Sequence, residues 1–223
     1  MLSQPRVTSP SIPTPPSNAL FHGNAPAFGL GHSSYNGRMT ITVRRARTGD
    51  VRSIQGLISP LVNSRVLLGK DPVVLYESIQ QFLVAETADG EVVGCGAIHV
   101  MWEDLGEVRT LAVSDSARGT GVGRVLLDAL ETEARALGLH RLFCLTFETK
   151  FFGAAGYVPI GEAGDGLRDA VGQPLVDPEG RQLVSPDVYN ELMRSPDEGV
   201  AEFLDLARVK PNTLGNTRML KIL

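Results

Sequence analysis

Cysteine, tryptophan and histidine are scarce in this chain, with 2 Cys, 1 Trp and 4 His among 223 residues. Cys95 and Cys144 both lie inside apolar, strand-like runs. This placement favours two buried free thiols in a reducing cytoplasm over a disulfide framework. The histidines are scattered, and two of them precede residue 38. The sequence therefore predicts no metal site.

Long apolar runs and an excess of positive charge are missing as well. No apolar run approaches the length of a membrane span, so we expect no membrane partner. A net charge of -4 and the lack of a basic cluster argue against nucleic acid as a partner. Hydrophobic content of 43% and charged content of 21% are ordinary for a globular protein. We expect a cytoplasmic protein with one substantial domain.

The first 38 residues differ in composition from the rest. They carry six of the 14 prolines, and their only charged side chains are Arg6 and Arg38. They lack the basic-then-apolar layout of a secretion signal. We expect a disordered N-terminal extension at 1–38 and a domain at 39–223. Within that domain, residues 161–184 are rich in Gly, Pro and Asp, which predicts a surface insertion.

From residue 40 onward, hydrophobic periodicity alternates between the spacing of strands and that of helices. It predicts a mixed α/β fold with a central mixed sheet flanked by helices. The expected strands are 40–44, 82–86, 92–100, 107–113, 141–147, 157–160 and 217–223. The expected helices are 48–61, 71–79, 121–137, 150–155 and 185–194. We expect the last strand to pair beside the strand that starts at Tyr157.

One stretch, Arg118-Gly119-Thr120-Gly121-Val122-Gly123, lies between an apolar strand and an amphipathic helix. A strand, a glycine-rich turn and a helix start together present free N–H groups and a positive helix end to an anion. Arg118 adds a charge that can fork onto a phosphate. The sequence thus predicts a pyrophosphate-binding turn, with a plain helix-entry turn as the alternative.

Two other phosphate-binding motifs fit this stretch poorly. A Walker loop ends in Gly-Lys-Ser/Thr, whereas Gly123 is followed by Arg124 and Val125. A dinucleotide fingerprint needs a third glycine at position 124 and an acid about twenty residues further on. Position 124 is Arg, and the strand at 141–145 ends in no acid.

The remaining pattern, Arg-x-x-Gly-x-Gly, resembles motif A of the GCN5-related N-acetyltransferases (GNAT), and the predicted order of strands and helices matches theirs. Several segments look like the acetyltransferase domain of N-acetylglutamate synthase, among them Gly106-Glu107-Val108-Arg109-Thr110-Leu111-Ala112-Val113 and Phe151-Phe152-Gly153-Ala154-Ala155-Gly156-Tyr157. The C-terminal stretch is similar to the short, single-domain form.

This resemblance implies acetyl transfer from acetyl-CoA to the α-amino group of L-glutamate, the entry to arginine biosynthesis. It implies no metal, and it leaves a homodimer open as the oligomeric state. An acetyltransferase that acts on another amino acid or amine is the first alternative. A non-catalytic acetyl-CoA-binding module is the second.

The resemblance also implies how the acetyl donor is held. The turn at 118–123 would bind the pyrophosphate, and the backbone of the central strand would bind the pantetheine arm and the thioester carbonyl. The strand residues implied are Leu111, Ala112 and Val113, whose side chains are expected in the core.

Catalytic residues follow from the same resemblance. Glu107 matches a glutamate that the synthases place near the amine, with a solvent-facing strand-end glutamate as the alternative; His99 and Glu148 are weaker candidates. Thr146 matches the Ser/Thr that stabilises the leaving thiolate. Phe152 stands where many members of the superfamily carry a tyrosine acid, so a tyrosine-based mechanism is in doubt.

An acidic acceptor also needs cations and hydrogen-bond donors. Lys70 matches a position where the longer synthases carry arginine. Near the C-terminus, Lys210, Thr217 and Arg218 are expected to bind a second carboxylate. For each of these four, the alternative is a solvated surface position. Asn212 and Asn216 nearby fit equally well as turn residues.

Overall fold

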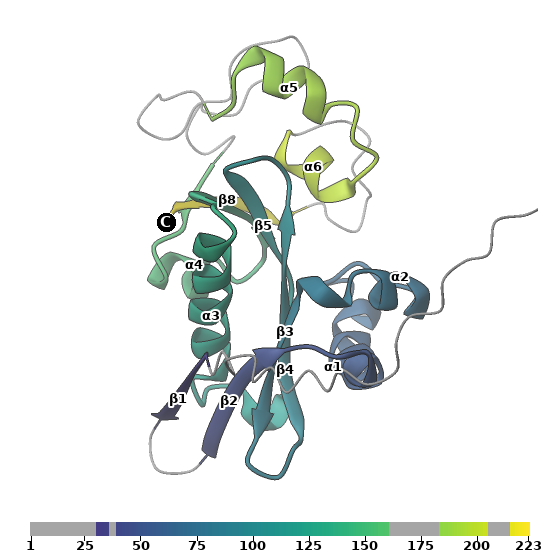
Figure 1. The fold of residues 1–223 in the computed structure, drawn as a ribbon, viewed down its shortest axis with the longest axis vertical. Coiled ribbons are helices and arrows are strands. Elements are labelled where there is room, and N and C mark those ends of the chain that lie inside the picture. Colours follow the sequence, from purple (N-terminus) through teal and green to yellow (C-terminus); the bar gives the residue numbers. More distant parts are fainter. Residues whose placement is uncertain (1–29, 36–38, 161–182, 205–214) are drawn as a thin grey trace, which may run out of the picture.

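A mixed sheet of eight strands lies at the centre of the protein in a computed structural model, which describes residues 30–35, 39–160, 183–204 and 215–223 (Figure 1). The strand order is β1-β2-β3-β4-β5-β6-β8-β7, and neighbours are antiparallel except for β5 and β6. The strands are β1 Leu30–Tyr35, β2 Met39–Arg45, β3 Phe82–Thr87, β4 Val92–Val100, β5 Leu105–Val113, β6 Arg141–Thr146, β7 Val158–Pro159 and β8 Thr217–Ile222.

Helices cover both faces of the sheet. Figure 1 shows α3 and α4 on one side of the strands, α1 and α2 on the other, and α5 and α6 beyond one end. The described helices are α1 Val51–Asn63, α2 Pro72–Glu77, α3 Val122–Ala136, α4 Thr149–Ala154, α5 Pro186–Leu192 and α6 Glu198–Phe203. Short 3-10 turns lie at Thr48–Asp50, Ile79–Gln81 and Asp115–Ala117. None of the described helices is both long and apolar enough to cross a bilayer.

Strand β3 shows how the sequence fills the two layers. Leu83 and Ala85 pack into the cluster that contains the buried face of α3, whereas Phe82 and Val84 pack into the cluster that contains α1 and Leu75 of α2. Successive strand residues point to opposite faces, so a strand buried on both faces is apolar without alternation. The mixed α/β architecture expected from the sequence is confirmed.

The boundaries of α3 follow the expected signals. The helix begins at Val122 directly after Gly121, whose φ is 91°. It ends before Gly138, whose φ is 85°. Glycine adopts this left-handed conformation without the Cβ clash that other residues meet. The predicted range of 121–137 is therefore correct to within one residue at each end.

Strands β5 and β6 pair over a short distance and then separate. Their parallel register covers only Leu105↔Arg141, Gly106↔Leu142 and Glu107↔Phe143, although β5 continues to Val113 and β6 to Thr146. Beyond Glu107, the edge of β5 that faces β6 has no partner strand among the described residues. The sheet therefore opens in its middle.

A bulge in β5 lies next to this opening. Cys95 pairs with Ala112 and Ala97 pairs with Arg109, so β5 has one residue more than β4 between these two pairs. Thr110 lies in the bulge with a φ of 58°. A non-glycine residue in this region costs about 1–3 kcal/mol, and such strain clusters at functional sites.

Three features differ from the sequence-based expectation. Strand β1 lies inside the stretch expected to be a disordered extension, and it pairs with β2 from Leu30↔Val43 to Tyr35↔Met39. Leu183 and Val184, the last residues of the expected surface insertion, are buried at 3% and 5% exposure. Helix α6 was not expected. The rest of the insertion, 161–182, and residues 1–29 and 36–38 lie outside the described residues.

The predicted pairing of the last strand is confirmed. Strand β8 pairs with β7 through Val158↔Leu220 and Pro159↔Met219. On its other side it pairs with β6 along the whole of both strands, from Arg141↔Ile222 to Thr146↔Thr217. The end of the chain thereby fixes the position of β6 beside the opening.

Candidate active site

The opening between β5 and β6 is part of a cavity of about 990 Å³. Its walls come from the loop before α2, β5, the glycine-rich turn, the end of β6 and α4, and the start of α6. This volume is in the range of small-molecule and cofactor sites. One continuous cavity thus joins segments that are far apart in the sequence.

The glycine-rich turn forms one end of this cavity. Gly119 and Gly121 have φ values of 73° and 91°. None of the N–H groups of Gly119, Gly121, Val122 and Gly123 finds a backbone acceptor among the described residues. These groups precede or begin a helix of 15 residues, so donors and a positive helix end converge there. The turn has the donor set that a pyrophosphate requires.

The side chains of the turn differ in whether they line the cavity. Arg118 lines the cavity, is 60% exposed, and lies 3.3 Å from Asp115. The Thr120 hydroxyl donates to the Ala117 carbonyl at 2.6 Å, and Val122 is buried in the core. Neither of these two lines the cavity in the described part of the chain. Their contribution to an anion site is restricted to the backbone.

The unpaired edge of β5 forms the middle of the cavity. Leu111, Ala112 and Val113 all line it. Ala112 is buried at 2%, in the cluster on the α1 side of the sheet, so its side chain belongs to the core as expected. Thr110, in the bulge, also lines the cavity. The polar main-chain groups beyond Glu107 are what this wall offers to a ligand.

The other end of the cavity holds a cluster of charged side chains around Arg109. Its Nε donates to Glu107 Oε2 at 2.9 Å, and its Nη2 donates to the same oxygen. Its Nη1 and Nη2 donate to Asp197 Oδ2 and Oδ1 at 3.2 and 2.9 Å. His99 Nε2 lies 3.5 Å from Asp197 Oδ2. One guanidinium thus joins the carboxylates of β5 and of the residue before α6.

Burial shifts the titration of this cluster. It raises the pKa of Glu107, although the charge of Arg109 opposes the shift. Burial, with repulsion from Arg109, lowers the pKa of Lys70 and of His99. For Asp197, burial alone would raise the pKa, but the hydrogen bonds and charge of Arg109 outweigh it and lower it. A glutamate whose pKa is raised by burial is a stronger base than an ordinary glutamate and is suited to take a proton.

Thr146 lies at the end of β6 and lines the cavity. It is 8% exposed, and its Oγ1 accepts a hydrogen bond from the Glu148 N–H at 2.9 Å. Its hydroxyl hydrogen is therefore able to donate to a ligand. Glu148 also lines the cavity, and its backbone N–H holds the Thr146 hydroxyl in place.

Phe152 is the position at which a tyrosine acid was considered. It lines the cavity at 5% exposure and makes edge-to-face contacts with Phe151 and Tyr157, with ring centroids 5.2 Å apart in each pair. Tyr157 is buried on the α3 side of the sheet, and burial raises its pKa far above its ordinary value. Neither ring is suited to donate a proton in this cavity.

The predicted acceptor-binding residues fall into three groups. Lys70 lines the cavity together with Glu107 and Arg109. Thr217 and Arg218 lie on β8, opposite Thr146 and Leu145 of β6, and neither lines the cavity as described. Lys210, like Asn212, lies outside the described residues. Asn216 lines the cavity. The structure places Lys70 and Glu107 in the same cavity, and the roles assigned to all of these residues stay predictions.

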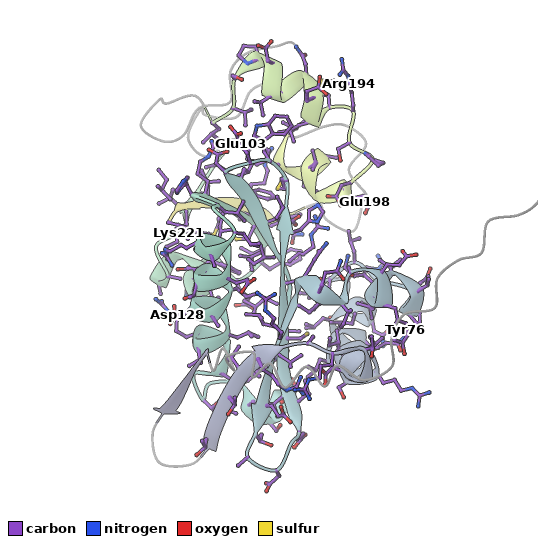
Figure 2. The ribbon with its side chains drawn as sticks, viewed as in Figure 1. Tyr76, Glu103, Asp128, Arg194, Glu198 and Lys221 are labelled. Atoms are coloured by element: carbon purple, nitrogen blue, oxygen red, sulfur yellow. The ribbon has the colours of Figure 1, made fainter. Side chains whose placement is uncertain are left out.

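Arg109, Asp197 and Gly199 were not nominated from the sequence. Gly199 packs directly on the ion pair: a Cβ there would overlap Glu107 Oε2 and lie 2.6 Å from Arg109 Nη2. Figure 2 shows Glu198, between Asp197 and Gly199 in sequence, at the end of α6 nearer the sheet. The sequence contained one indication of Arg109: it is two residues from Glu107 on the same strand, which places both side chains on one face.

Known proteins are similar to this chain in sequence and in fold. A sequence profile of the acetyltransferase (GNAT) family matches residues 68–157. The amino-acid acetyltransferase of Mycobacterium tuberculosis is 48% identical over 183 residues, which cover 81% of this chain and 94% of the relative. The amino-acid acetyltransferase of Pseudomonas fluorescens is 40% identical over 119 residues, but these cover only 27% of that longer protein. The chain belongs to the acetyltransferase (GNAT) family.

Within that family, it is an acetyltransferase of the amino-acid acetyltransferase type. The crystal structure of Rv2747 from M. tuberculosis, in complex with CoA and a ligand designated NLQ, is 47% identical, with a TM-score of 0.67. It covers 81% of this chain and 98% of its own. N-acetylglutamate synthase from Neisseria gonorrhoeae has a TM-score of 0.59 at 24% identity, over 82% of this chain and 35% of its own, which shows a common fold.

Proposed function

We propose that this enzyme transfers the acetyl group of acetyl-CoA to the α-amino group of L-glutamate, the reaction that opens arginine biosynthesis. The observation that carries the proposal is the continuity of the cavity. It runs from the glycine-rich turn, suited to a pyrophosphate, to the cluster that contains Glu107 and Lys70. A donor and an acceptor bound in one cavity are close enough to react.

The donor end needs little beyond main chain. The pyrophosphate of acetyl-CoA would accept hydrogen bonds from the N–H groups between Gly119 and Gly123, with Arg118 at the exposed rim. The pantetheine arm would lie along β5 from Val113 towards Glu107. Main-chain N–H groups there would polarise the thioester carbonyl.

The acceptor end supplies a base and a cation. Glu107, directly or through a water, takes a proton from the ammonium of the amino acid, so that the free amine attacks the thioester carbon. Lys70 pairs with a carboxylate of the acceptor. Thr146 donates its hydroxyl hydrogen to the sulfur as the C–S bond breaks. A hydroxyl stabilises a thiolate without protonating it fully, so the second proton, which the nitrogen loses as the amide forms, reaches the sulfur through a water.

L-Glutamine is the second candidate acceptor, and one observation favours it. Both edges of the Arg109 guanidinium are already engaged, one with Glu107 and the other with Asp197. An acceptor with a single carboxylate, held by Lys70, would leave these contacts undisturbed. An acceptor with two carboxylates would compete with Asp197 for Arg109.

The test is the release of free CoA thiol by the purified full chain with acetyl-CoA and one acceptor at a time. Glutamate, glutamine, aspartate and no acceptor form the series, with the acetylated product identified by mass spectrometry. Glutamate-dependent thiol release with formation of N-acetylglutamate is expected. Activity with glutamine alone would replace the acceptor, and no acceptor-dependent release would point to an acetyl-CoA-binding module instead.

A further inference from the structure

Asp197 and Arg109 lie 88 residues apart in sequence and meet at the acceptor end of the cavity. Two bonds join them, from Nη1 to Oδ2 at 3.2 Å and from Nη2 to Oδ1 at 2.9 Å. Both side chains are largely withdrawn from solvent, at 17% exposure for Arg109 and 26% for Asp197. The pair is thus a two-bond fork in a mostly buried setting, the strong form of an arginine–carboxylate contact.

The position of Asp197 is fixed by its backbone surroundings. Its Oδ1 also accepts the N–H of Val200 at 3.2 Å, which caps the start of α6. Gly199 packs against Glu107 and Arg109 without room for a Cβ. The first turn of α6 is therefore seated on the ion pair. The helix cap and the packing of Gly199 together position Asp197 against Arg109.

A guanidinium has two edges that can each bind a carboxylate, so a contact on one edge decides what the other can still bind. Arginine binds carboxylates in parallel two-bond pairs along two edges, one made by Nε with Nη2 and one by Nη1 with Nη2. Glu107 takes the first edge and Asp197 takes the second. Asp197 thus occupies the edge through which Arg109 would bind a carboxylate of the acceptor.

Other charged groups face the same place. Lys70, His99 and Glu198 lie close enough to act electrostatically on the cluster. Glu202 is buried and lines the same cavity. The three carboxylates from the α6 segment, Asp197, Glu198 and Glu202, therefore stand opposite the cations of β5 and of the loop before α2. A second negative charge on the acceptor would enter this acidic side of the cavity.

We propose that Asp197 is a specificity-determining residue: it occupies the Nη1/Nη2 edge of Arg109 and thereby lowers the advantage that glutamate, whose side chain ends in a carboxylate, has over glutamine as acceptor. The inference rests on the proposed function, because it concerns the acceptor of the same reaction. It identifies the α6 segment as the element that sets the ratio of kcat/KM for glutamate to kcat/KM for glutamine.

The test compares kcat/KM for glutamate and glutamine in wild type and in Asp197→Asn. Asparagine is as good a helix cap as aspartate, so α6 keeps its first turn while the charge is lost. The expected result is a rise of at least tenfold in the glutamate-to-glutamine ratio, with the KM for acetyl-CoA unchanged. The matched control is Glu191→Gln on α5, which removes an exposed carboxylate that pairs with Arg194. It should leave the glutamate-to-glutamine ratio unchanged.

A second background shows whether Asp197 acts through Arg109. The double variant Arg109→Met with Asp197→Asn should have the same glutamate-to-glutamine ratio of kcat/KM as Arg109→Met alone, because no guanidinium is left for Asp197 to occupy. An unchanged ratio in the single variant, or an equal shift in both backgrounds, overturns the inference. Failure of wild type to acetylate either amino acid would instead overturn the proposed function, and the inference with it.

Discussion

The two ends of the cavity are built in different ways. The donor end comes from one continuous stretch, in which β5 leads through Ser114 to the turn at Arg118–Gly123 and on into α3. The acceptor end takes Lys70 from the loop before α2, Glu107 and Arg109 from β5, and Asp197 from the residue that precedes α6. Main-chain groups dominate the first end and charged side chains the second.

The two ends of the cavity therefore depend on different properties of the sequence. Main-chain donors at the turn need glycine at positions of positive φ and tolerate variation elsewhere. The charge cluster depends on every partner, because removing one member of a buried pair leaves the other uncompensated. Substitutions at the donor end should therefore act on one kinetic constant, the KM for acetyl-CoA. Those at the acceptor end should act on the chemistry and on the choice of substrate.

The largest effect is expected from Glu107→Gln. If Glu107 accepts the proton of the acceptor amine, kcat should fall about a hundredfold or more, the usual scale of general-base catalysis. Burial raises the pKa of Glu107, so wild-type activity should fall with acidification at a higher pH than an ordinary glutamate would give. Steady-state rates across a pH series measure both effects.

The pH series also separates chemistry from damage. The loss in Glu107→Gln should shrink as pH rises, because more of the amino acid is already a free amine. A loss that stays constant at all pH values would mean that the substitution disturbs Arg109 and the packing of Gly199. Circular dichroism of the variant, compared with wild type, checks that the fold is retained.

A smaller effect is expected from Lys70→Met. Charge-assisted hydrogen bonds contribute about 1.5–3 kcal/mol, so the KM for glutamate should rise about tenfold or more. The KM for acetyl-CoA should stay close to wild type, because Lys70 is on the acceptor side of the cavity. Arg218→Met is the companion variant and is expected to have the weaker effect, because Arg218 does not line the cavity as described. A larger effect for Arg218 would reverse this assignment.

The smallest effect of the three is expected from Gly121→Val. The φ of 91° is unfavourable for any residue with a Cβ and worst for a branched one. The turn should shift away from the pyrophosphate, with a rise of about five- to tenfold in the KM for acetyl-CoA and no change in preference between glutamate and glutamine. A folded variant with wild-type affinity for acetyl-CoA would remove the turn from the donor site.

Local signals explain which parts of the fold were predictable. The apolar face of α3 and the glycines at both of its ends lie within one short stretch, so the element and its limits could be read directly. Strand β1 was missed because Leu30–Tyr35, with the sequence LGHSSY, lacks an apolar alternation, and its pairing with β2 is a tertiary property. Helix α6 has six residues, too few to show a helical period; α2 and α4 are equally short, but the Asp71-Pro72 start and Gly156 after the end marked them.

The same reasoning applies to the site. The backbone geometry of the glycine-rich turn could be predicted because it is a property of consecutive residues, whereas its role in donor binding stays a prediction. Glu107, Thr146 and Lys70 were nominated through resemblance, and all three line the cavity. Asp197 gave no signal, because its meaning depends on Arg109, 88 residues earlier. Nothing in the sequence around 197 distinguishes it from a helix cap, which it also is.

The three residue pairs between β5 and β6 have a consequence for cooperativity. They are the only strand pairing, within the described residues, between the unit β1–β5 and the unit β6, β8 and β7. A donor that lies between Val113 of β5 and Thr146 of β6 touches both units, so it binds tightly only while they stay together. By mass action, acetyl-CoA at a hundred times its Kd stabilises the state in which the two units are in contact by about 2.7 kcal/mol. Amide hydrogen exchange in β8 should therefore slow when acetyl-CoA binds, although β8 itself lies beyond β6, on the side away from β5.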